Sequence, residues 1–157
     1  RSNFEFQRSK PCEMISNAVE RMSFQAQKAD LLLTQDYPEG LPQVLADPTR
    51  ISQVFVNLIH NAIKFTPPGG SIHLTAWQEG NEVVFLVRDN GVGIARKNLK
   101  RIFERFYKAD RARSGGGTGL GLSICKHIID AHGGRIWAES EENVGSKFFF
   151  TIPASAV

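Results

Sequence analysis

Hydrophobic residues recur along this chain with two different periods, one typical of helices and one typical of strands. Apolar positions three to four residues apart predict long helices over residues 11–29 and 47–65. The two apolar stripes consist of Ile15, Ala18, Val19 and Met22 and of Ile51, Val54, Phe55, Leu58 and Ala62. Asp47 followed by Pro48 strengthens the second prediction, because aspartate caps a helix start and proline fits the first turn.

Alternating apolar and polar residues between turn residues predict a set of short strands. These strands cover residues 4–7, 31–36, 44–46, 71–78, 82–89, 135–140 and 146–152. We also expect a short helix near residues 97–104, a mobile loop over residues 108–117 and a third long helix over residues 120–132. Long helices between pairs of adjacent strands predict an α+β fold, a two-layer α/β sandwich with the helices packed on one face of a mixed β-sheet.

The composition fits a single globular domain. Of the 157 residues, 41% are hydrophobic and 22% are charged, which excludes a disordered chain. Cys12 and Cys125 belong to no CxxC or Cys/His motif, so we exclude a zinc site and expect reduced thiols in a cytoplasmic protein. No apolar run approaches the ~20 residues of a membrane span. Because the chain begins at Arg1 and not at Met, we expect a fragment of a longer protein, whose membrane anchoring stays open.

The charge is concentrated in one segment. The net charge of the chain is +3, but residues 96–113 hold eight basic and two acidic residues, a local charge of +6 that leaves −3 for the rest. A basic protein would suggest nucleic acid as a partner, whereas one basic segment in a mildly acidic chain favours a local anion site.

Three polar residues share one face of the second predicted helix. Asn57 and Asn61 lie four positions apart, and Lys64 follows three positions later. An amide oxygen can coordinate a hard cation such as Mg2+, and an ammonium group can meet a phosphate. The same residues could instead form an ordinary solvated helix face, and the pattern by itself leaves both interpretations open.

Two glycine motifs lie between the predicted elements. Asp89, Gly91 and Gly93 end a strand, where a carboxylate could accept a hydrogen bond from an exocyclic amine, although an ordinary turn has the same pattern. Residues 115–122 contain five glycines and open a helix, as in phosphate sites or in a flexible linker. Leu122 breaks a dinucleotide-binding GxGxxG pattern, and the chain has no P-loop.

Taken in order, these motifs resemble the ATP-binding catalytic domain of bacterial sensor histidine kinases. The similarity runs from about residue 47 to residue 153, and its segments are residues 57–66 (N box), 89–94 (first glycine box), 103–107 (F box) and 117–122 (second glycine box). The resemblance implies the Bergerat ATP-binding fold. It also implies that residues 1–157 are a single ATP-binding catalytic domain from which the dimerisation and phosphoacceptor domain is absent.

The resemblance further implies roles for individual residues. Catalytic roles fall to Asn57, Lys64 and Lys108, with Lys108 near the terminal phosphate, while Asn61 would be the metal ligand that holds Mg2+ on the phosphates of ATP. The implied nucleotide-binding residues are Asn61, Lys64, Phe65, Asp89, Gly91, Gly93, Ile94, Phe106, Gly117, Thr118, Gly119, Leu120 and Gly121. The last five belong to the segment that would close over ATP.

The implied function is transfer of the γ-phosphoryl group of ATP to a histidine on a partner dimerisation domain, with a response regulator downstream and no nucleic acid partner. The histidines of this chain lack the sequence context of the family's phosphoacceptor, and we expect His127 and His132 to be surface or cap residues. ATP-hydrolysing relatives carry Glu where Asn57 stands, and an amide cannot act as a general base.

Three other functions stay open on the sequence. The chain could be an ATP-hydrolysing domain of the gyrase, chaperone or mismatch-repair type, although Asn57 argues against it. It could be a regulatory module that binds ATP without transfer, or a nucleic-acid-binding module that uses its basic segment. The aromatic residues Phe103, Phe106 and Tyr107 are interpreted either as core or as packing at the base of the lid.

Overall fold

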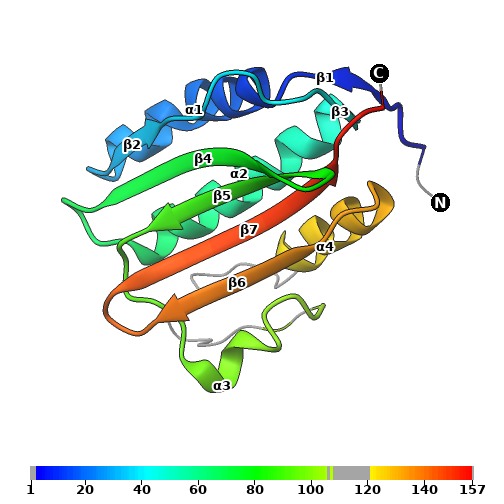
Figure 1. Cartoon of the computed structure of the whole chain (residues 1–157). Coiled ribbons are helices and arrows are strands. Elements are labelled where there is room, and N and C mark those ends of the chain that lie inside the picture. Colours follow the sequence, from blue (N-terminus) through cyan, green and yellow to red (C-terminus); the bar gives the residue numbers. More distant parts are fainter. Residues whose placement is uncertain (1–2, 106, 108–120, 157) are drawn as a thin grey trace.

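A mixed five-stranded sheet forms one layer of the computed structural model, which describes residues 3–105, 107 and 121–156 (Figure 1). The strand order is β2-β4-β5-β7-β6, in which β2 and β4 are parallel and all other neighbours are antiparallel. The bounds are β2 Leu32–Gln35, β4 Ser71–Glu79, β5 Glu82–Asp89, β7 Gly145–Pro153 and β6 Ile136–Glu141. One parallel pair in an otherwise antiparallel sheet confirms the prediction of a mixed sheet.

Helices form the second layer and cover one face of this sheet, as Figure 1 shows. The long helices are α1 (Pro11–Lys28), α2 (Pro48–Phe65) and α4 (Gly121–Ala131), close to their predicted bounds. The fourth, α3 (Arg96–Leu99), is shorter than the predicted residues 97–104. Phe103 instead packs its ring against Phe148, with 6.3 Å between the ring centroids, so the chain leaves the helix to reach the core.

A small antiparallel pair, β1 (Gln7–Ser9) with β3 (Val44–Ala46), lies beside the main sheet. The predicted strand at residues 4–7 therefore begins too early. Phe4 and Phe6 precede β1, because both rings pack against the imidazole of His132 and do not belong to a strand.

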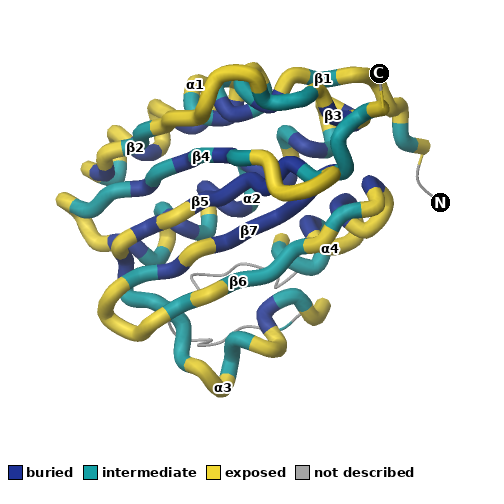
Figure 2. Tube along the Cα trace, viewed as in Figure 1, coloured by how far each residue is buried: buried dark blue, intermediate teal, exposed yellow. Residues whose placement is uncertain are grey.

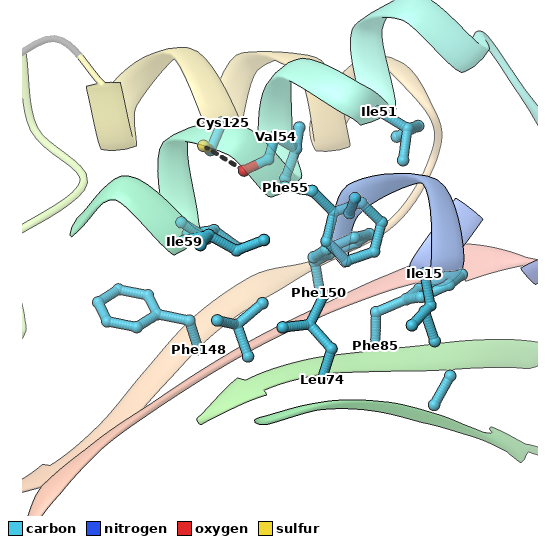
Figure 3. Packing of buried hydrophobic residues seen from close by; sticks show 14 of the residues in the cluster. Ile15, Ile51, Val54, Phe55, Ile59, Leu74, Phe85, Cys125, Phe148 and Phe150 are labelled. Atoms are coloured by element: carbon cyan, nitrogen blue, oxygen red, sulfur yellow. Dashed lines mark hydrogen bonds between the residues drawn. The ribbon is translucent and has the colours of Figure 1, made fainter. Parts of the chain in front are cut away.

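The core lies between the two layers and is rich in phenylalanine (Figure 3). The ring of Phe55 on α2 contacts Phe85 and Phe150 on the sheet, with centroid distances of 5.8 and 5.2 Å. Each such ring contributes roughly 1.5–3 kcal/mol by leaving water. Buried positions follow β5, β7 and the facing sides of the helices in Figure 2.

Strand β7 buries phenylalanines on both of its faces. Phe148 and Phe150 point toward the helices, as the alternation predicts. Phe149 points the other way and is 8% exposed, because Trp77 and Trp137 pack around it. The ring of Trp137 stacks on that of Phe149 with 5.0 Å between centroids, so the face of the sheet away from the helices has a small apolar cluster of its own.

Helix α2 is fixed at its start and along its apolar side. The Asp47 carboxylate accepts hydrogen bonds from the backbone N–H of Arg50 at 3.1 Å and of Glu5 at 2.8 Å. The predicted stripe is buried in full: Ile51, Val54, Phe55, Leu58 and Ala62. With that side against the sheet, the side that carries Asn57, Asn61 and Lys64 faces away from the sheet.

Candidate functional site

The polar face of α2 meets the start of α4. The side-chain amide of Asn57 donates a hydrogen bond to the backbone carbonyl of Gly121 at 3.2 Å. Asn57 and Asn61 are half-buried and Lys64 is exposed, with its ammonium 5.8 Å from the ring centroid of Phe65. An amide oxygen, an exposed cation and an aromatic ring therefore follow one another along about two helical turns.

Asp89 supplies a buried carboxylate at the end of β5. Its side chain is 7% exposed, and its Oδ1 accepts a hydrogen bond from the backbone N–H of Gly91 at 2.8 Å. Burial raises the pKa of Asp89, while hydrogen bonds from the backbone of Gly91 and Ser146 oppose that shift. A carboxylate with so little access to water is a strong acceptor for an N–H group of a ligand.

The turn at residues 91–93 is held on both sides by backbone. The N–H of Val92 donates to the carbonyl of Phe65 at 3.0 Å, and the carbonyl of Val92 accepts from Asn143 at 2.7 Å. A Cβ on Gly91 would lie 2.3 Å from the Phe65 carbonyl oxygen. Gly93 has a φ of +75°, and a Cβ there would lie 2.3 Å from the carbonyl oxygen of Glu141. Both glycines are required by the fold itself.

Three hydroxyl groups belong to this site and carry no role in the sequence-based assignment. Thr66 is buried, and its Oγ1 has no hydrogen-bond partner among the described residues. Ser140 Oγ accepts from the N–H of Ile94 at 2.7 Å and lies 2.8 Å from Ser146 Oγ. Ser146 pairs with Asp89 across the β5–β7 ladder. For Ser146, the alternation of residues along β7 was a sequence signal that could have indicated its burial, because it places Ser146 on the same face as Phe148.

Besides the contacts of Asp89 with Gly91 and of Lys64 with Phe65, the structure brings together predicted site residues from different elements. Phe65 and Gly91 are in backbone contact, and Asn57 bonds Gly121. Ile94 follows the glycine turn and is tied to β6 through Ser140. Six predicted residues lie outside the part of the chain that the structure describes: Phe106, Lys108, Gly117, Thr118, Gly119 and Leu120.

The described aromatic residues of the F box pack against the core. Phe103 contacts Phe148, and the Tyr107 hydroxyl donates to the side chain of Asn98. The guanidinium of Arg101 lies 4.5 Å from the ring centroid of Tyr107. The interpretation of these two aromatic residues as core is confirmed.

The prediction that His127 and His132 are surface or cap residues is confirmed, because the His132 ring, one residue past α4, bonds the backbone carbonyl of Ile128 in the last turn of that helix. His127 is exposed, as expected. His132 is only 7% exposed, because Phe4 and Phe6 cover its ring and both ring nitrogens have backbone partners. The thiols of Cys12 and Cys125 are free, and burial raises the pKa of Cys125 to about 12.

The described residues hold neither a cluster of metal ligands nor a helix fit to span a membrane. Within residues 3–105, 107 and 121–156, no group of three or more His, Cys, Asp or Glu side chains could hold a metal ion. None of the helices described by the structure combines the length and the apolar character that crossing a membrane requires.

The fold and the site together define an α/β sandwich that presents an amide–lysine helix face beside a glycine turn at the end of a strand. The profile of the family "Histidine kinase-, DNA gyrase B-, and HSP90-like ATPase" matches residues 46–156. The chain belongs to this family, and the resemblance in the sequence is confirmed.

Individual relatives are histidine kinases. The adaptive-response sensory kinase SasA of Trichormus variabilis is 42% identical over 142 residues, which cover 90% of this chain and 34% of SasA. The chain thus spans about a third of the length of the curated relatives it matches. The structure of the catalytic domain of histidine kinase ThkA is 36% identical with a TM-score of 0.84, covering 96% of this chain and 97% of that one.

Two solved complexes extend this comparison. Full-length ShkA in complex with AMPPNP is 31% identical with a TM-score of 0.87, over 99% of this chain and 33% of ShkA. ThkA in complex with the response regulator TrrA is 34% identical with a TM-score of 0.79, over 96% of this chain and 42% of that one. The α+β sandwich with helices on one face of a mixed sheet is therefore the fold of histidine kinase catalytic domains.

Proposed function

We propose that this chain is the ATP-binding catalytic domain of a sensor histidine kinase, spans residues 1–157 as one domain and acts in the cytoplasm. It transfers the γ-phosphoryl group of ATP to a histidine on the dimerisation domain of the same kinase, and a response regulator receives the phosphate afterwards. The observation that carries the proposal is the buried Asp89 carboxylate, which bonds the glycine turn that is itself hydrogen-bonded to Phe65 at the end of α2. The AMPPNP complex of ShkA and the TrrA complex of ThkA support the nucleotide and the regulator, respectively.

In this proposal the adenine base lies against the glycine turn. Asp89 accepts a hydrogen bond from the exocyclic amino group of adenine, and its low exposure strengthens that bond. Gly91, Gly93 and Ile94 line the base on one side, and the half-buried ring of Phe65 lies near it on the other. Phe106 completes the base pocket.

The phosphates lie along the polar face of α2. Lys64 is exposed and meets a phosphate as a point charge. Lys108 contacts the terminal phosphate, and the segment Gly117, Thr118, Gly119, Leu120 and Gly121 closes over it with backbone N–H groups.

The residues present fit a Mg2+ ion that is bound mainly by the nucleotide. Mg2+ commonly takes one or two protein oxygens and completes its shell with phosphates and water. The described residues hold no cage of acidic or histidine ligands, whereas the half-buried Asn61 offers a single amide oxygen on the helix face. Asn61 would hold the ion, which when bound neutralises charge on the phosphates.

Asn57 favours phosphoryl transfer over hydrolysis. Its amide has no basic lone pair that could accept a proton from water. The Nδ2 group is already engaged by the carbonyl of Gly121, so the side chain holds the start of α4 in place. Without a base to activate water, ATP would remain intact until a phosphoacceptor histidine arrives.

Mixing the chain with a dimerisation domain that carries a phosphoacceptor histidine, in the presence of Mg2+ and γ-labelled ATP, tests this function. We expect acid-labile, base-stable label on the dimerisation domain and none on the chain alone. Replacing the acceptor histidine by glutamine should abolish the label. Steady release of inorganic phosphate without labelling of the partner would instead identify the chain as an ATP-hydrolysing relative.

A further inference from the structure

His132 is a buried titratable group that lies outside the nucleotide site. It follows the last residue of α4, and its Nδ1 lies 2.8 Å from the backbone carbonyl oxygen of Ile128. The backbone N–H of Asp47 donates to its Nε2 at 3.0 Å. A carbonyl can only accept and an amide N–H can only donate, so the proton must be on Nδ1 and the ring is neutral.

The N-terminal segment, residues 4–6, packs on this ring. Phe4 and Phe6 meet the imidazole edge to face, with centroid distances of 5.7 and 4.9 Å, and stack on each other at 5.7 Å. The N–H of Glu5, between them, donates to the carboxylate of Asp47 at 2.8 Å. One imidazole thus contacts the N-terminal segment, the start of α2 and the end of α4.

We propose that His132 is a positioning residue whose neutral imidazole fastens the N-terminal segment to α2 and α4, and that protonation of Nε2 releases this segment. Protonation would occupy the Nε2 lone pair that accepts a hydrogen bond from Asp47. The new Nε2–H and the backbone N–H of Asp47 would then be two donors facing each other. The bond to the helix start would break, and the surface on which Phe4 and Phe6 pack would move. The proton comes from a hydronium ion in the solvent, and the one bond that forms is the N–H bond at Nε2.

The surroundings of the His132 ring have opposing effects on its pKa. Burial lowers the pKa of His132, while the carbonyl of Ile128 and the negative charge of Asp47 oppose that shift. The Asp47 carboxylate is itself occupied by the N–H groups of Glu5 and Arg50. The Arg50 guanidinium lies 4.7 Å from the ring centroid of Phe4, and the ring of His127 lies 6.4 Å from it. Glu5 is the remaining charge on the segment.

Protonation of His132 would affect the two helices that carry the nucleotide site, although His132 itself lies outside that site. Helix α2 carries Asn61 and Lys64, and α4 begins at Gly121, so His132 ties the far ends of both helices to the segment. The proposal stands independently of the proposed phosphotransfer, because it can be tested on the chain without nucleotide.

Nuclear magnetic resonance on the intact chain tests it directly. At pH 7.5 the ring nitrogens of His132 should report the Nδ1–H tautomer, and the ring should titrate below about pH 6.5, the value of a free histidine. Over the same interval the amide exchange of Glu5 and Asp47, corrected for intrinsic rates, should accelerate as the pH falls, by up to about tenfold per pH unit. Both amides should share one midpoint with the ring.

Two variants sharpen the experiment. His132→Gln keeps an acceptor for Asp47 but cannot titrate, so the pH dependence of the Glu5 amide should disappear. His60→Gln, at an exposed position of α2, should leave that dependence unchanged. An Nε2–H tautomer at neutral pH, a His132 pKa above 6.5, or a Glu5 amide that ignores the titration would overturn the proposal. If His132→Gln fails to fold, the wild-type titration alone decides.

Discussion

The side-chain amide of Asn57 donates a hydrogen bond to the carbonyl of Gly121 and so joins the middle of α2 to the first residue of α4. The two residues are 64 positions apart and belong to two different motifs. Their contact makes Asn57 a structural support for the start of α4 as well as a candidate for the phosphate site.

Removing this bond should destabilise the fold modestly. Asn57→Ala should lower the free energy of unfolding by about 1 kcal/mol, the usual net value of such a bond. Asn57→Asp should cost more, because a carboxylate would then face the Gly121 carbonyl without a proton to share. Urea denaturation measures both. Gln53→Ala, one helical turn earlier and exposed, serves as the matched control and should change stability by less than about 0.5 kcal/mol.

Mg–ATP binding should depend on the two residues that follow Asn57 along the same face. Asn61→Ala should abolish binding that requires Mg2+, and Lys64→Ala should weaken binding most at low salt, where charge attraction is least screened. Isothermal calorimetry with and without Mg2+ separates the two effects. Affinity close to wild type in Asn61→Ala, with Gln53→Ala as reference, would remove Asn61 from the metal site.

The ionised Asp89 carboxylate should lower the stability of the fold and strengthen the binding of Mg–ATP. Its pKa is raised in the folded state, so the unfolded chain loses this proton first as the pH rises. The ionised carboxylate therefore costs stability at neutral pH, and that cost appears as the pH climbs from about 3.8, the value of a free aspartate, through the higher native pKa. Asp89→Asn should lack this component, and the variant should gain stability relative to wild type between pH 4 and 7.

Nucleotide binding by the variants of Asp89 gives the second half of that test. Asp89→Ala should abolish Mg–ATP binding, and Asp89→Asn should weaken it, because the neutral amide is a poorer acceptor for the adenine amino group. Thermal denaturation across the pH range and calorimetry at pH 7 measure the pair of effects. An Asp89→Asn variant that loses stability as the pH rises, in parallel with wild type, would assign the pH dependence to another group.

The sequence was most informative where periodicity and capping agree. Asp47, Pro48 and the apolar stripe predict α2 to within a residue at both ends, because each of these signals is local. The bond between Asn57 and Gly121 could not be predicted, since it depends on how α4 returns to α2. The start of β1 was misplaced for the same reason: Phe4 and Phe6 alternate like a strand but pack on His132.

Cys125 should be unreactive in the folded chain. Its thiol is fully buried, its Sγ lies 3.8 Å from the carbonyl of Val54 (Figure 3), and burial raises its pKa to about 12. At pH 8 a thiol reagent should therefore modify the half-buried Cys12 and leave Cys125 until the chain unfolds. Cys12→Ser should show no labelling before denaturation, and rapid labelling of that variant would mean that α2 and α4 separate readily.

Two glycines with similar sequence surroundings should respond in opposite ways to alanine. A methyl group on Gly91 would collide with the backbone carbonyl of Phe65 at 2.3 Å, which cannot move without shifting the end of α2. Gly91→Ala should lower the free energy of unfolding by roughly 1–3 kcal/mol or more. At Gly121 the nearest atom that the described residues would offer to a new methyl group is the side-chain nitrogen of Asn57 at 4.0 Å, and the residue begins a helix.

Gly121→Ala should therefore fold at least as well as the wild type, since alanine favours the helix over glycine by up to about 1 kcal/mol. Any loss of Mg–ATP affinity in this variant then reports on the ligand and not on the fold. Urea denaturation followed by calorimetry on the same samples separates the two glycines. Equal stability losses in both variants would contradict the distinction between a glycine that the fold requires and one that serves the nucleotide.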